Sequence, residues 1–289
     1  MTIATIDIGG TGIKFASLTP DGKILDKTST PTPETLEDLL AWLDQRLSEQ
    51  DYRGIAMSVP GAVNQKTGVI EGISAIPYIH GFSWYQVLAH HQLPVHLEND
   101  ANCVGLSELL AHPEIENAAC VVIGTGIGGA MMINGKLHRG RHGLGGEFGY
   151  MTTLAPTEKL NNWSQLASTG NMVRYVIEKS GQTDWDGRKI YQEAAAGNTL
   201  CQEAIERMNR NLAQGLLNIQ YLIDPDVISL GGSISQNPEF IKGVQKAVDA
   251  FVERYEEYTI APVIQACTYQ ADANLYGALV NWLQEENQW

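Results

Sequence analysis

Cysteine is scarce in this sequence, with four residues among 289. They stand far apart, and no two form a Cys-x-x-Cys pair, which argues against a zinc knuckle and against a disulfide framework. We therefore expect buried free thiols in a reducing compartment, at positions Cys103, Cys120, Cys201 and Cys267.

Positive charge is also in short supply, because 19 Lys and Arg residues face 33 Asp and Glu residues, a formal net charge of -14. A field of that sign repels phosphate backbones and anionic lipid, so we expect neither nucleic acid nor a membrane as a partner. A small anionic ligand stays compatible if backbone amides or a metal ion hold it.

Long apolar runs are missing as well. No stretch approaches the roughly 18 uninterrupted apolar residues of a membrane span, and the first residues carry no basic segment with an apolar run behind it. We therefore expect a cytoplasmic protein without a signal peptide.

What the sequence does contain is a repeated pattern. A strand, a glycine turn, a second strand and a hairpin occur near residue 3 and again near residue 119. The length is typical of two moderate domains. The repeat predicts two related α/β lobes, with a boundary near residues 112–118 that separates a lobe over 1–115 from one over 116–271.

Hydrophobic periodicity predicts the elements within these lobes. Thr32 is expected to cap the first helix, with Pro33 as its first residue, and Asn134-Gly135 predicts a hairpin. Helices are expected at about 33–50, 101–111, 164–179, 187–196, 199–222, 238–255 and 272–286, and strands at about 2–8, 13–18, 24–28, 54–59, 95–97, 118–123, 130–133, 226–230 and 263–266.

Three glycine-rich turns, at residues 9–12, 124–129 and 231–233, follow predicted strands. Glycine permits positive φ and close approach to backbone amides, so such turns can cradle an anion, although one turn alone is equally an ordinary hairpin. Three of them, with Lys14 beside the first, predict a triphosphate site. The better-known phosphate loops do not match, because Gly-x4-Gly-Lys-Ser/Thr is absent and a strand, not a helix, follows 124–129.

Three acidic residues are candidates for chemistry. Asp100 stands between a strand and a helix, where it can accept a proton from a substrate hydroxyl or simply cap the helix. Asp7 can bind the Mg²⁺ of a nucleotide, directly or through water, or serve a turn. Glu147 lies among glycines, where it can bond sugar hydroxyls or belong to a surface loop. The seven histidines show no metal-ligand spacing with cysteine or carboxylate, so we expect ordinary histidines.

Together these motifs resemble the ROK family of sugar kinases and regulators, within the actin/hexokinase/Hsp70 ATPase superfamily. The resemblance implies an α/β fold of two ribonuclease H-like (actin-like ATPase) lobes with ATP and sugar in the cleft between them. It also implies that the helix in 272–289 packs back on the N-terminal lobe. The segments that carry it run through nearly the whole chain, at 7–14, 58–61, 98–102, 124–129, 146–149, 230–232 and 277–278.

The activity implied by the resemblance is transfer of a phosphoryl group from Mg·ATP to a sugar hydroxyl, most often O6. By the same resemblance Asp100 is the general base, and Asn99, Glu147, Gly61 and Tyr150 line the sugar. The positions implied for ATP are Gly9, Gly10, Thr11, Lys14, Gly124, Thr125 and Gly126 at the phosphates, and Gly231 and Gly232 at the adenosine.

One region departs from the family pattern. Tyr150 stands where ROK members usually carry a histidine, and residues 151–168 contain no cysteine where the family has a zinc loop. We therefore expect ATP and Mg²⁺ as cofactors but no zinc. The family contacts near the anomeric end are in doubt, which favours a substrate substituted at C1, a glucoside or a disaccharide, as for ROK members that phosphorylate β-glucosides.

Other functions are compatible with parts of this pattern. The main alternative is a kinase of free glucose, fructose or an N-acylhexosamine. A ROK regulator that binds sugar and DNA needs a helix-turn-helix region ahead of the first phosphate motif, which begins at Asp7. A non-catalytic sugar sensor is disfavoured because Asp100 and both phosphate turns are present. Homodimers are common in the family, so a second copy of this chain is a candidate partner.

Overall fold

The computed structural model describes residues 2–153, 161–255 and 257–289. The chain divides into two compact units, and three separate segments build the first of them. The segment 139–145 lies with the first unit, whereas the expected boundaries assign it to the second lobe. The first unit comprises Met1–Glu114, Arg139–Gly145 and Ala271–Trp289, and the second comprises Ile115–His138 and Gly146–Gln270.

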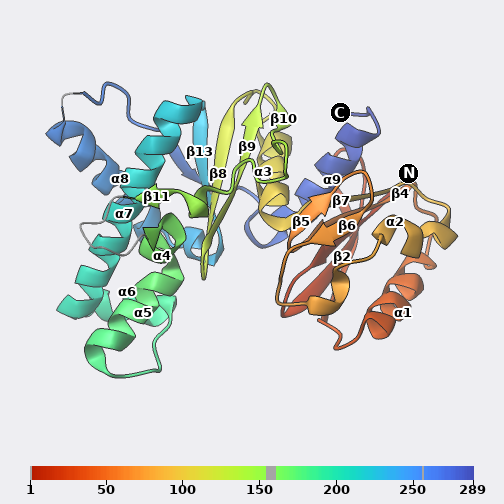
Figure 1. Cartoon of the computed structure of the whole chain (residues 1–289), viewed down its shortest axis with the longest axis horizontal. Helices are drawn as coiled ribbons and strands as arrows, with labels where there is room; N and C mark the ends of the chain where they lie inside the picture. Colours follow the sequence, from red (N-terminus) through yellow and green to blue (C-terminus); the bar gives the residue numbers. More distant parts are fainter. Residues whose placement is uncertain (1, 154–160, 256) are drawn as a thin grey trace. The chain divides into compact units, whose positions relative to one another are not determined.

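The first unit is built on a five-stranded sheet of order β3-β2-β1-β4-β7 (Figure 1). The first three strands form the expected antiparallel meander, and β4 and β7 then add in parallel on the other side of β1. All residues of β1 and β4 are buried, as near-continuous apolar runs predict for central strands. The strands are β1 Ile3–Ile8, β2 Gly12–Leu18, β3 Ile24–Pro31, β4 Gly54–Val59 and β7 Val95–Asn99.

Helices from distant parts of the chain cover this sheet: α1 (Leu36–Leu47), α3 (Asp100–Ala111) and α9 (Ala273–Glu285). The apolar face of α9 joins Ile3, Leu18 and other sheet residues in one buried cluster, so the last helix completes the first unit (blue among red and orange in Figure 1). A Cβ on Gly277 would stand 1.7 Å from the carbonyl oxygen of Cys103, so only glycine allows α9 to approach α3 this closely.

The start of α1 differs from the expectation. Thr35, not Thr32, is the N-cap, and its side chain accepts a hydrogen bond from the Asp38 amide. Thr32 instead bonds the first glycine turn through its amide and its hydroxyl, which keeps it in extended backbone. The helix therefore begins three residues later than predicted, and it ends at Leu47.

Between β4 and β7 the chain forms small elements that the periodicity did not reveal. They are the hairpin of β5 (Ala62–Asn64) and β6 (Val69–Glu71), followed by the short helix α2 (Trp84–Val87) and the 3-10 helix η2 (Ala89–His91). Elements of this length are too short to show a hydrophobic period.

The second unit repeats the strand order of the first, as β10-β9-β8-β13-β14. β8 and β9 pair antiparallel, and β13 and β14 join in parallel, as β4 and β7 do. The hairpin after β9 turns at Asn134 and Gly135, both with positive φ, as predicted. The strands are β8 Ala118–Ile123, β9 Ile127–Ile133, β10 Lys136–Leu137, β13 Val227–Gly231 and β14 Ile264–Ala266, and a separate pair is β11 Thr152–Thr153 with β12 Asn161–Asn162.

Helices and the sheet bury one large core in this unit. The helix expected over 164–179 is in fact two, because Ser168 leaves the helix and caps the second one by accepting from the Asn171 amide. Trp163 packs against Gly215, where any Cβ would lie 2.1 Å from the indole. The helices are α4 Trp163–Ala167, α5 Thr169–Ser180, α6 Gly187–Ala195, α7 Thr199–Ile223 and α8 Pro238–Arg254.

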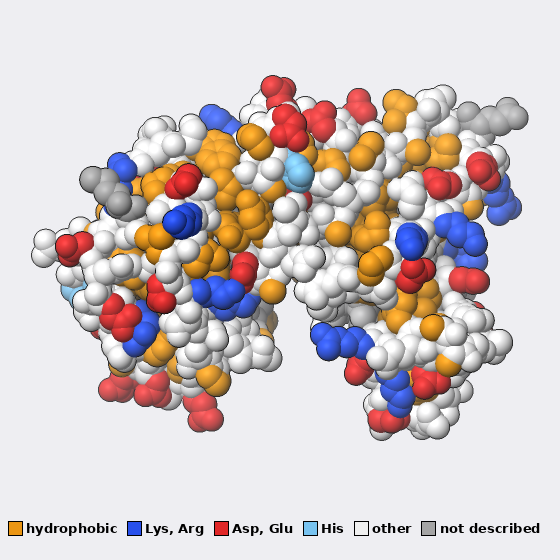
Figure 2. Space-filling model, turned by 180° about the vertical axis from the view of Figure 1, so that it is seen from behind, with side chains coloured by type: hydrophobic (Ala, Val, Ile, Leu, Met, Phe, Trp, Pro, Cys, Tyr) orange, Lys and Arg blue, Asp and Glu red, His pale blue; other side chains and the backbone are white. Residues whose placement is uncertain are grey.

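The surface charges, the cysteines and the helices can be compared with what the composition predicts. On the face shown in Figure 2, basic side chains stand among acidic ones. All four cysteines are free and buried, as predicted. Among the described helices, none combines the length and the apolar character that crossing a bilayer requires.

Candidate functional site

The first glycine turn places a lysine and a carboxylate together. β1 and β2 pair with Asp7 opposite Lys14, and the Lys14 Nζ donates to Asp7 Oδ2 at 3.0 Å. The other oxygen, Oδ1, accepts from Asn274 Nδ2 of α9 at 2.9 Å. The Asp7 carboxylate is therefore oriented from both sides.

The turn itself is held by backbone contacts. The Gly9 amide donates to the Gly12 carbonyl at 3.1 Å, and the Thr32 hydroxyl donates to the Gly9 carbonyl at 2.5 Å. A Cβ on Gly10 would meet the Ala75 side chain at 3.0 Å. These contacts fix a tight turn whose amides are free of bulky side chains.

A cavity of about 480 Å³ opens beside this turn. It brings together five residues predicted from sequence, namely Asp7, Gly9, Thr11, Lys14 and Asp100, and it adds Asn274, which the sequence did not suggest. The Asn274 Oδ1 is buried without a hydrogen-bond partner. A buried acceptor left unpaired is costly, so its presence beside two carboxylates indicates room for a cation or a donor.

Asp100 is the first residue of α3 and lies partly buried at the end of β7. Its Oδ1 accepts the Ala101 amide at 2.8 Å. Burial raises the pKa of Asp100, the Ala101 bond opposes this, and the charge of Asp7 adds to the increase. A carboxylate with a raised pKa is better matched to accepting a proton near neutral pH.

The helix cap is Asn99, so the alternative of Asp100 as N-cap is wrong. Asn99 Oδ1 accepts the Asn102 amide at 3.1 Å, while Nδ2 donates to the Gly61 carbonyl at 3.1 Å. Gly61 has φ of 106°, and a Cβ there would lie 2.9 Å from the Glu71 carbonyl. The structure thus joins Gly61, Asn99 and Asp100, three predicted site residues, at one end of the sheet.

A buried ion pair supports this junction, and the sequence did not suggest it. Glu98 is 1% exposed, and its Oε2 accepts from Arg139 Nε at 2.6 Å. Its Oε1 accepts the Asn99 amide and Asn102 Nδ2, both at 2.8 Å. Arg139 continues to Asn281 Oδ1 on α9 at 2.7 Å. The buried Glu98–Arg139 ion pair therefore holds in place the segment that carries Asn99 and Asp100.

In the second unit, the turn at residues 124–126 packs against the first residues of α5. The Gly124 amide donates to the Gly126 carbonyl at 2.9 Å, and the Gly170 amide donates to the Gly124 carbonyl at 3.1 Å. A Cβ on Gly170 would stand 2.4 Å from the Thr125 carbonyl oxygen. The predicted residues Gly124, Thr125 and Gly126 thus sit against a helix N-terminus, which favours anions.

The third glycine turn lies next to the second. Gly232 has φ of 89°, and a Cβ there would lie 2.1 Å from the Ile123 carbonyl oxygen at the end of β8. Gly231 ends the buried strand β13. Because β8 and β13 are paired, their following turns emerge at the same edge of the sheet.

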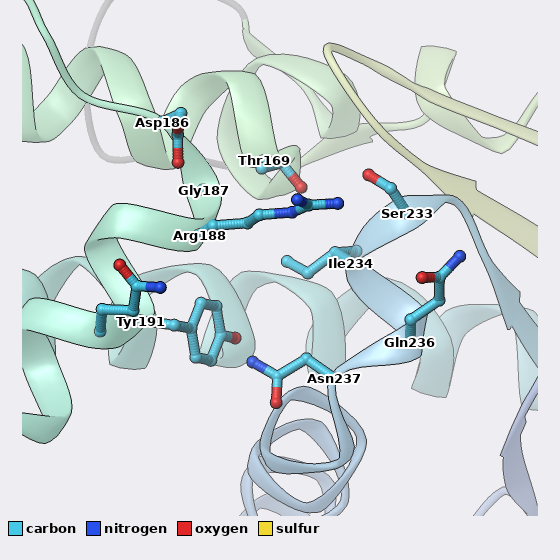
Figure 3. A pocket seen from close by; sticks show the side chains of 10 residues that line it. Thr169, Asp186, Gly187, Arg188, Tyr191, Ser233, Ile234, Gln236 and Asn237 are labelled. Carbon is cyan, nitrogen blue, oxygen red and sulfur yellow. The ribbon is translucent and has the colours of Figure 1, made fainter.

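A cavity of about 710 Å³ opens at this edge. Figure 3 shows the Arg188 side chain reaching from α6 toward Thr169 and Ser233, with the Tyr191 ring on the side of Asn237. The Thr169 and Tyr191 hydroxyls are buried without hydrogen-bond partners, and burial raises the pKa of Tyr191. These cavity residues were missed from sequence, where only Gly231 and Gly232 marked the place.

Tyr150 ends a short 3-10 helix of the second unit, η3 (Phe148–Tyr150), and Glu147 is the residue just before that helix. Gly146, with φ of 87°, packs against the backbone of Ala130, and a Cβ on Gly149 would stand 2.0 Å from the Ile127 carbonyl oxygen. Glu147 follows directly and is partly buried, whereas Tyr150 is 73% exposed. The glycines on both sides of Glu147 therefore hold it against β9.

Comparison with known proteins gives the family. The model of the ROK family matches residues 3–285. The chain belongs to the ROK family.

Among ROK relatives, the β-glucoside kinase of Listeria monocytogenes is 35% identical over all of this chain and 99% of its own. The β-glucoside kinase of Klebsiella pneumoniae is 31% identical over 98% of this chain and 97% of its own. A crystal structure of a ROK family protein from Streptococcus pneumoniae, in complex with sucrose, is 90% identical over the whole of both chains, with a TM-score of 0.98.

The predicted fold class is confirmed, since both units are α/β with matching strand order and solved ROK kinases share the fold. The expectation of no zinc rests partly on residues 154–160, which lie outside the described residues, so it stays a prediction.

Proposed function

We infer that this chain is an ATP-dependent sugar kinase, and we propose that its acceptor is O6 of a glucoside or disaccharide substituted at C1. The observation that carries the proposal is the placing of Asp100 in the cavity of the first unit, beside the glycine turn and Lys14. Family membership supports the kinase class.

In the proposed reaction the Asp100 carboxylate accepts the proton of the acceptor hydroxyl. The sugar oxygen then bonds the γ-phosphorus, the bond from that phosphorus to its bridging oxygen breaks, and ADP leaves. Such transfer depends mainly on positioning and on neutralising charge. Asn99, held by Gly61, is proposed to orient the sugar from the same junction. Glu147 and Tyr150 are proposed as further sugar contacts.

The first cavity fits a magnesium ion, since Mg²⁺ prefers oxygen ligands. Asp7 offers a carboxylate, and the buried Oδ1 of Asn274 offers an acceptor without a partner. We propose that these two residues hold the ion, directly or through water, and that the ion neutralises phosphate charge when it is bound.

The nucleotide is proposed to use the glycine turns. Amides of Gly9, Gly10 and Thr11, with Lys14, and those of Gly124, Thr125 and Gly126 are proposed to meet phosphate oxygens. The cavity beside Gly231 and Gly232 has the volume of an ordinary ligand site and mixes apolar walls with a few polar groups, which suits a nucleoside.

Two observations support a substrate that carries a substituent at C1, namely the named relatives and the sequence of residues 151–168. Two relatives are named β-glucoside kinases, and the 90% identical protein was crystallised with sucrose, whose glucose is bonded through C1. Tyr150, which is exposed, stands in place of the family's histidine, and residues 151–168 lack the cysteines of its zinc loop, so we do not expect the family's contacts near the anomeric end.

The proposal predicts a ranking of acceptors. We expect kcat/KM for a C1-substituted glucose to exceed that for free glucose by about tenfold or more, as one added or lost set of pocket contacts commonly gives. A coupled assay of ADP release measures it with cellobiose, a β-aryl glucoside, sucrose, glucose, fructose and N-acetylglucosamine. Equal or better turnover of a free sugar contradicts the C1 proposal, and no sugar-dependent ADP release contradicts the kinase. Phosphorus NMR of the product tests O6.

The second cavity yields a further prediction. Arg188→Ala is expected to raise KM for ATP about five- to tenfold and to leave KM for the sugar within twofold, because only the nucleotide side loses a contact. Initial rates at varied ATP and varied sugar measure the two constants. Arg174→Ala is the matched control, since Arg174 is exposed on the neighbouring helix α5. An unchanged KM for ATP places the nucleoside elsewhere.

A further inference from the structure

Two neighbouring histidines and an aspartate converge on the surface of the first unit, away from the cavity described above. Asp44 lies on α1, and His90 and His91 form the end of η2. The Asp44 Oδ1 is 3.1 Å from His90 Nε2 and 2.8 Å from His91 Nε2. One ligand atom from each residue lies within 4.8 Å of the other two.

A neutral His90 ring has too few protons for the hydrogen bonds that its two nitrogens face. Its Nδ1 lies 3.0 Å from the Val87 carbonyl oxygen, and its Nε2 faces the Asp44 carboxylate. Both partners are acceptors, whereas a neutral imidazole carries one proton. One nitrogen therefore faces an oxygen with nothing between them, unless a second proton or a metal ion fills the gap.

One metal ion can fill this gap and serve both histidines. The two imidazole rings lie side by side, with centroids 4.0 Å apart, so both can face the same ion. A single divalent ion bound to both Nε2 atoms and to Asp44 satisfies all three groups at once. The Nδ1 contact of His90 with a backbone carbonyl is also the usual outer support of a metal-bound histidine.

The distances from Asp44 Oδ1 to the two histidine nitrogens are close to the separation of two ligand atoms around such an ion. Zinc binds nitrogen and carboxylate oxygen at about 2.0–2.2 Å, which in a tetrahedron separates ligand atoms by about 3.3 Å. The two distances from Asp44 Oδ1, 3.1 and 2.8 Å, need changes of well under 1 Å. His90 and Asp44 remain accessible, with 57% and 45% of their side chains exposed, so an ion and a water can reach the site.

We propose that Asp44, His90 and His91 bind one divalent transition-metal ion of the zinc type, with water as the fourth ligand. The bound ion links α1 to η2, two surface elements of the first unit that share the Asp44 carboxylate. No sequence motif marks this site, because Asp44 lies 46 and 47 residues from its partners.

Metal binding is tested on the full-length chain after treatment with a chelator. Excess Mg²⁺ in the buffer occupies oxygen-rich sites, and Zn²⁺ is then added in equilibrium dialysis. We expect one Zn²⁺ per chain with Kd below about 10 µM and a rise in Tm of about 2–6 °C at saturation. Co²⁺ in its place is expected to give the visible absorption of a tetrahedral site.

Two variants and a control decide whether these residues hold the ion. His91→Gln and Asp44→Asn are each expected to weaken Zn²⁺ binding at least tenfold and to abolish the rise in Tm, with kinase activity unchanged. His112→Gln is the matched control, because His112 faces Glu114 at 3.6 Å as one histidine beside one carboxylate. Absence of Zn²⁺ binding by the unaltered chain, or equal binding by the variants, overturns the proposal.

Discussion

Replacing Asp100 by asparagine is expected to lower kcat by about 10²–10⁴-fold while sugar affinity stays within about threefold of the original. Asparagine keeps the size of the side chain and an oxygen for the Ala101 amide, which Asp100 Oδ1 now accepts at 2.8 Å. It cannot take up a proton at the pH of the reaction. Steady-state rates with the preferred acceptor, and calorimetric titration with the sugar alone, measure the two effects separately.

The raised pKa of Asp100 gives this prediction a second readout. A base must be ionised to act, so kcat/KM falls as the pH drops through the pKa of Asp100. Burial, and next the charge of Asp7, raise that pKa above the ordinary aspartate value of 3.8. We expect the acid limb of the profile above the range of an exposed aspartate, and no such limb in the residual rate of Asp100→Asn.

The control for Asp100 is another carboxylate of the same unit. Asp26→Asn, in the exposed part of β3, removes the same charge away from the cavity and is expected to leave kcat within twofold. If Asp100→Asn retains more than a tenth of the original kcat, the assignment of Asp100 as the base is wrong. If sugar binding is lost with kcat, Asp100 acts mainly in binding.

Replacing Arg139 by methionine is expected to destabilise the first unit by about 2–4 kcal/mol. The substitution leaves the Glu98 carboxylate, whose side chain is 2% exposed, without its opposing charge. The expected cost reaches below the roughly 3–5 kcal/mol of a fully buried pair, because 28% of the Arg139 side chain is exposed to solvent. Native-state hydrogen exchange in β7 and α3 measures the loss where the pair acts.

Two further variants separate charge from packing at this pair. Lys27→Met removes the cation of an exposed pair with Asp272 in the same unit and is expected to cost less than about 1 kcal/mol. Adding Glu98→Gln to Arg139→Met is expected to recover at least about 1 kcal/mol, since no charge is then buried alone. Equal costs for Arg139→Met and Lys27→Met contradict the role given to the buried pair.

Regular elements were predicted well from sequence because their patterns are local. The strand at 118–123 matches β8 in its bounds, and the two meanders followed from alternating apolar residues broken by glycine turns. The predictions of helix ends failed where a side chain makes a different hydrogen bond from the one that its sequence position suggests. Thr32 has the chemistry of a cap but bonds the glycine turn instead, and Ser168 breaks a helix whose apolar period continues through it.

The residues of the candidate site also fall into those that local motifs predicted and those that were missed. Asp7, Asp100 and the glycine turns were found because motifs mark them in one short segment each. Arg139, Asn274 and Arg188 were missed because each acts through a partner far away in sequence, and a single sequence does not show which distant residues meet. Asn274 reaches Asp7 across 267 positions, a pairing that only the docking of α9 creates.

The path of the chain through the first unit has a consequence for its synthesis. This unit begins with the first strand but is completed only by residues 271–289, which supply α9, the partner of Asp7 and the carbonyl of Ala271 that accepts from Lys14. The second unit lies wholly between these segments and emerges earlier from the ribosome. The unit that carries Asp100 is therefore the first to be translated and the last able to complete its fold. A chain released before α9 is made cannot complete that unit.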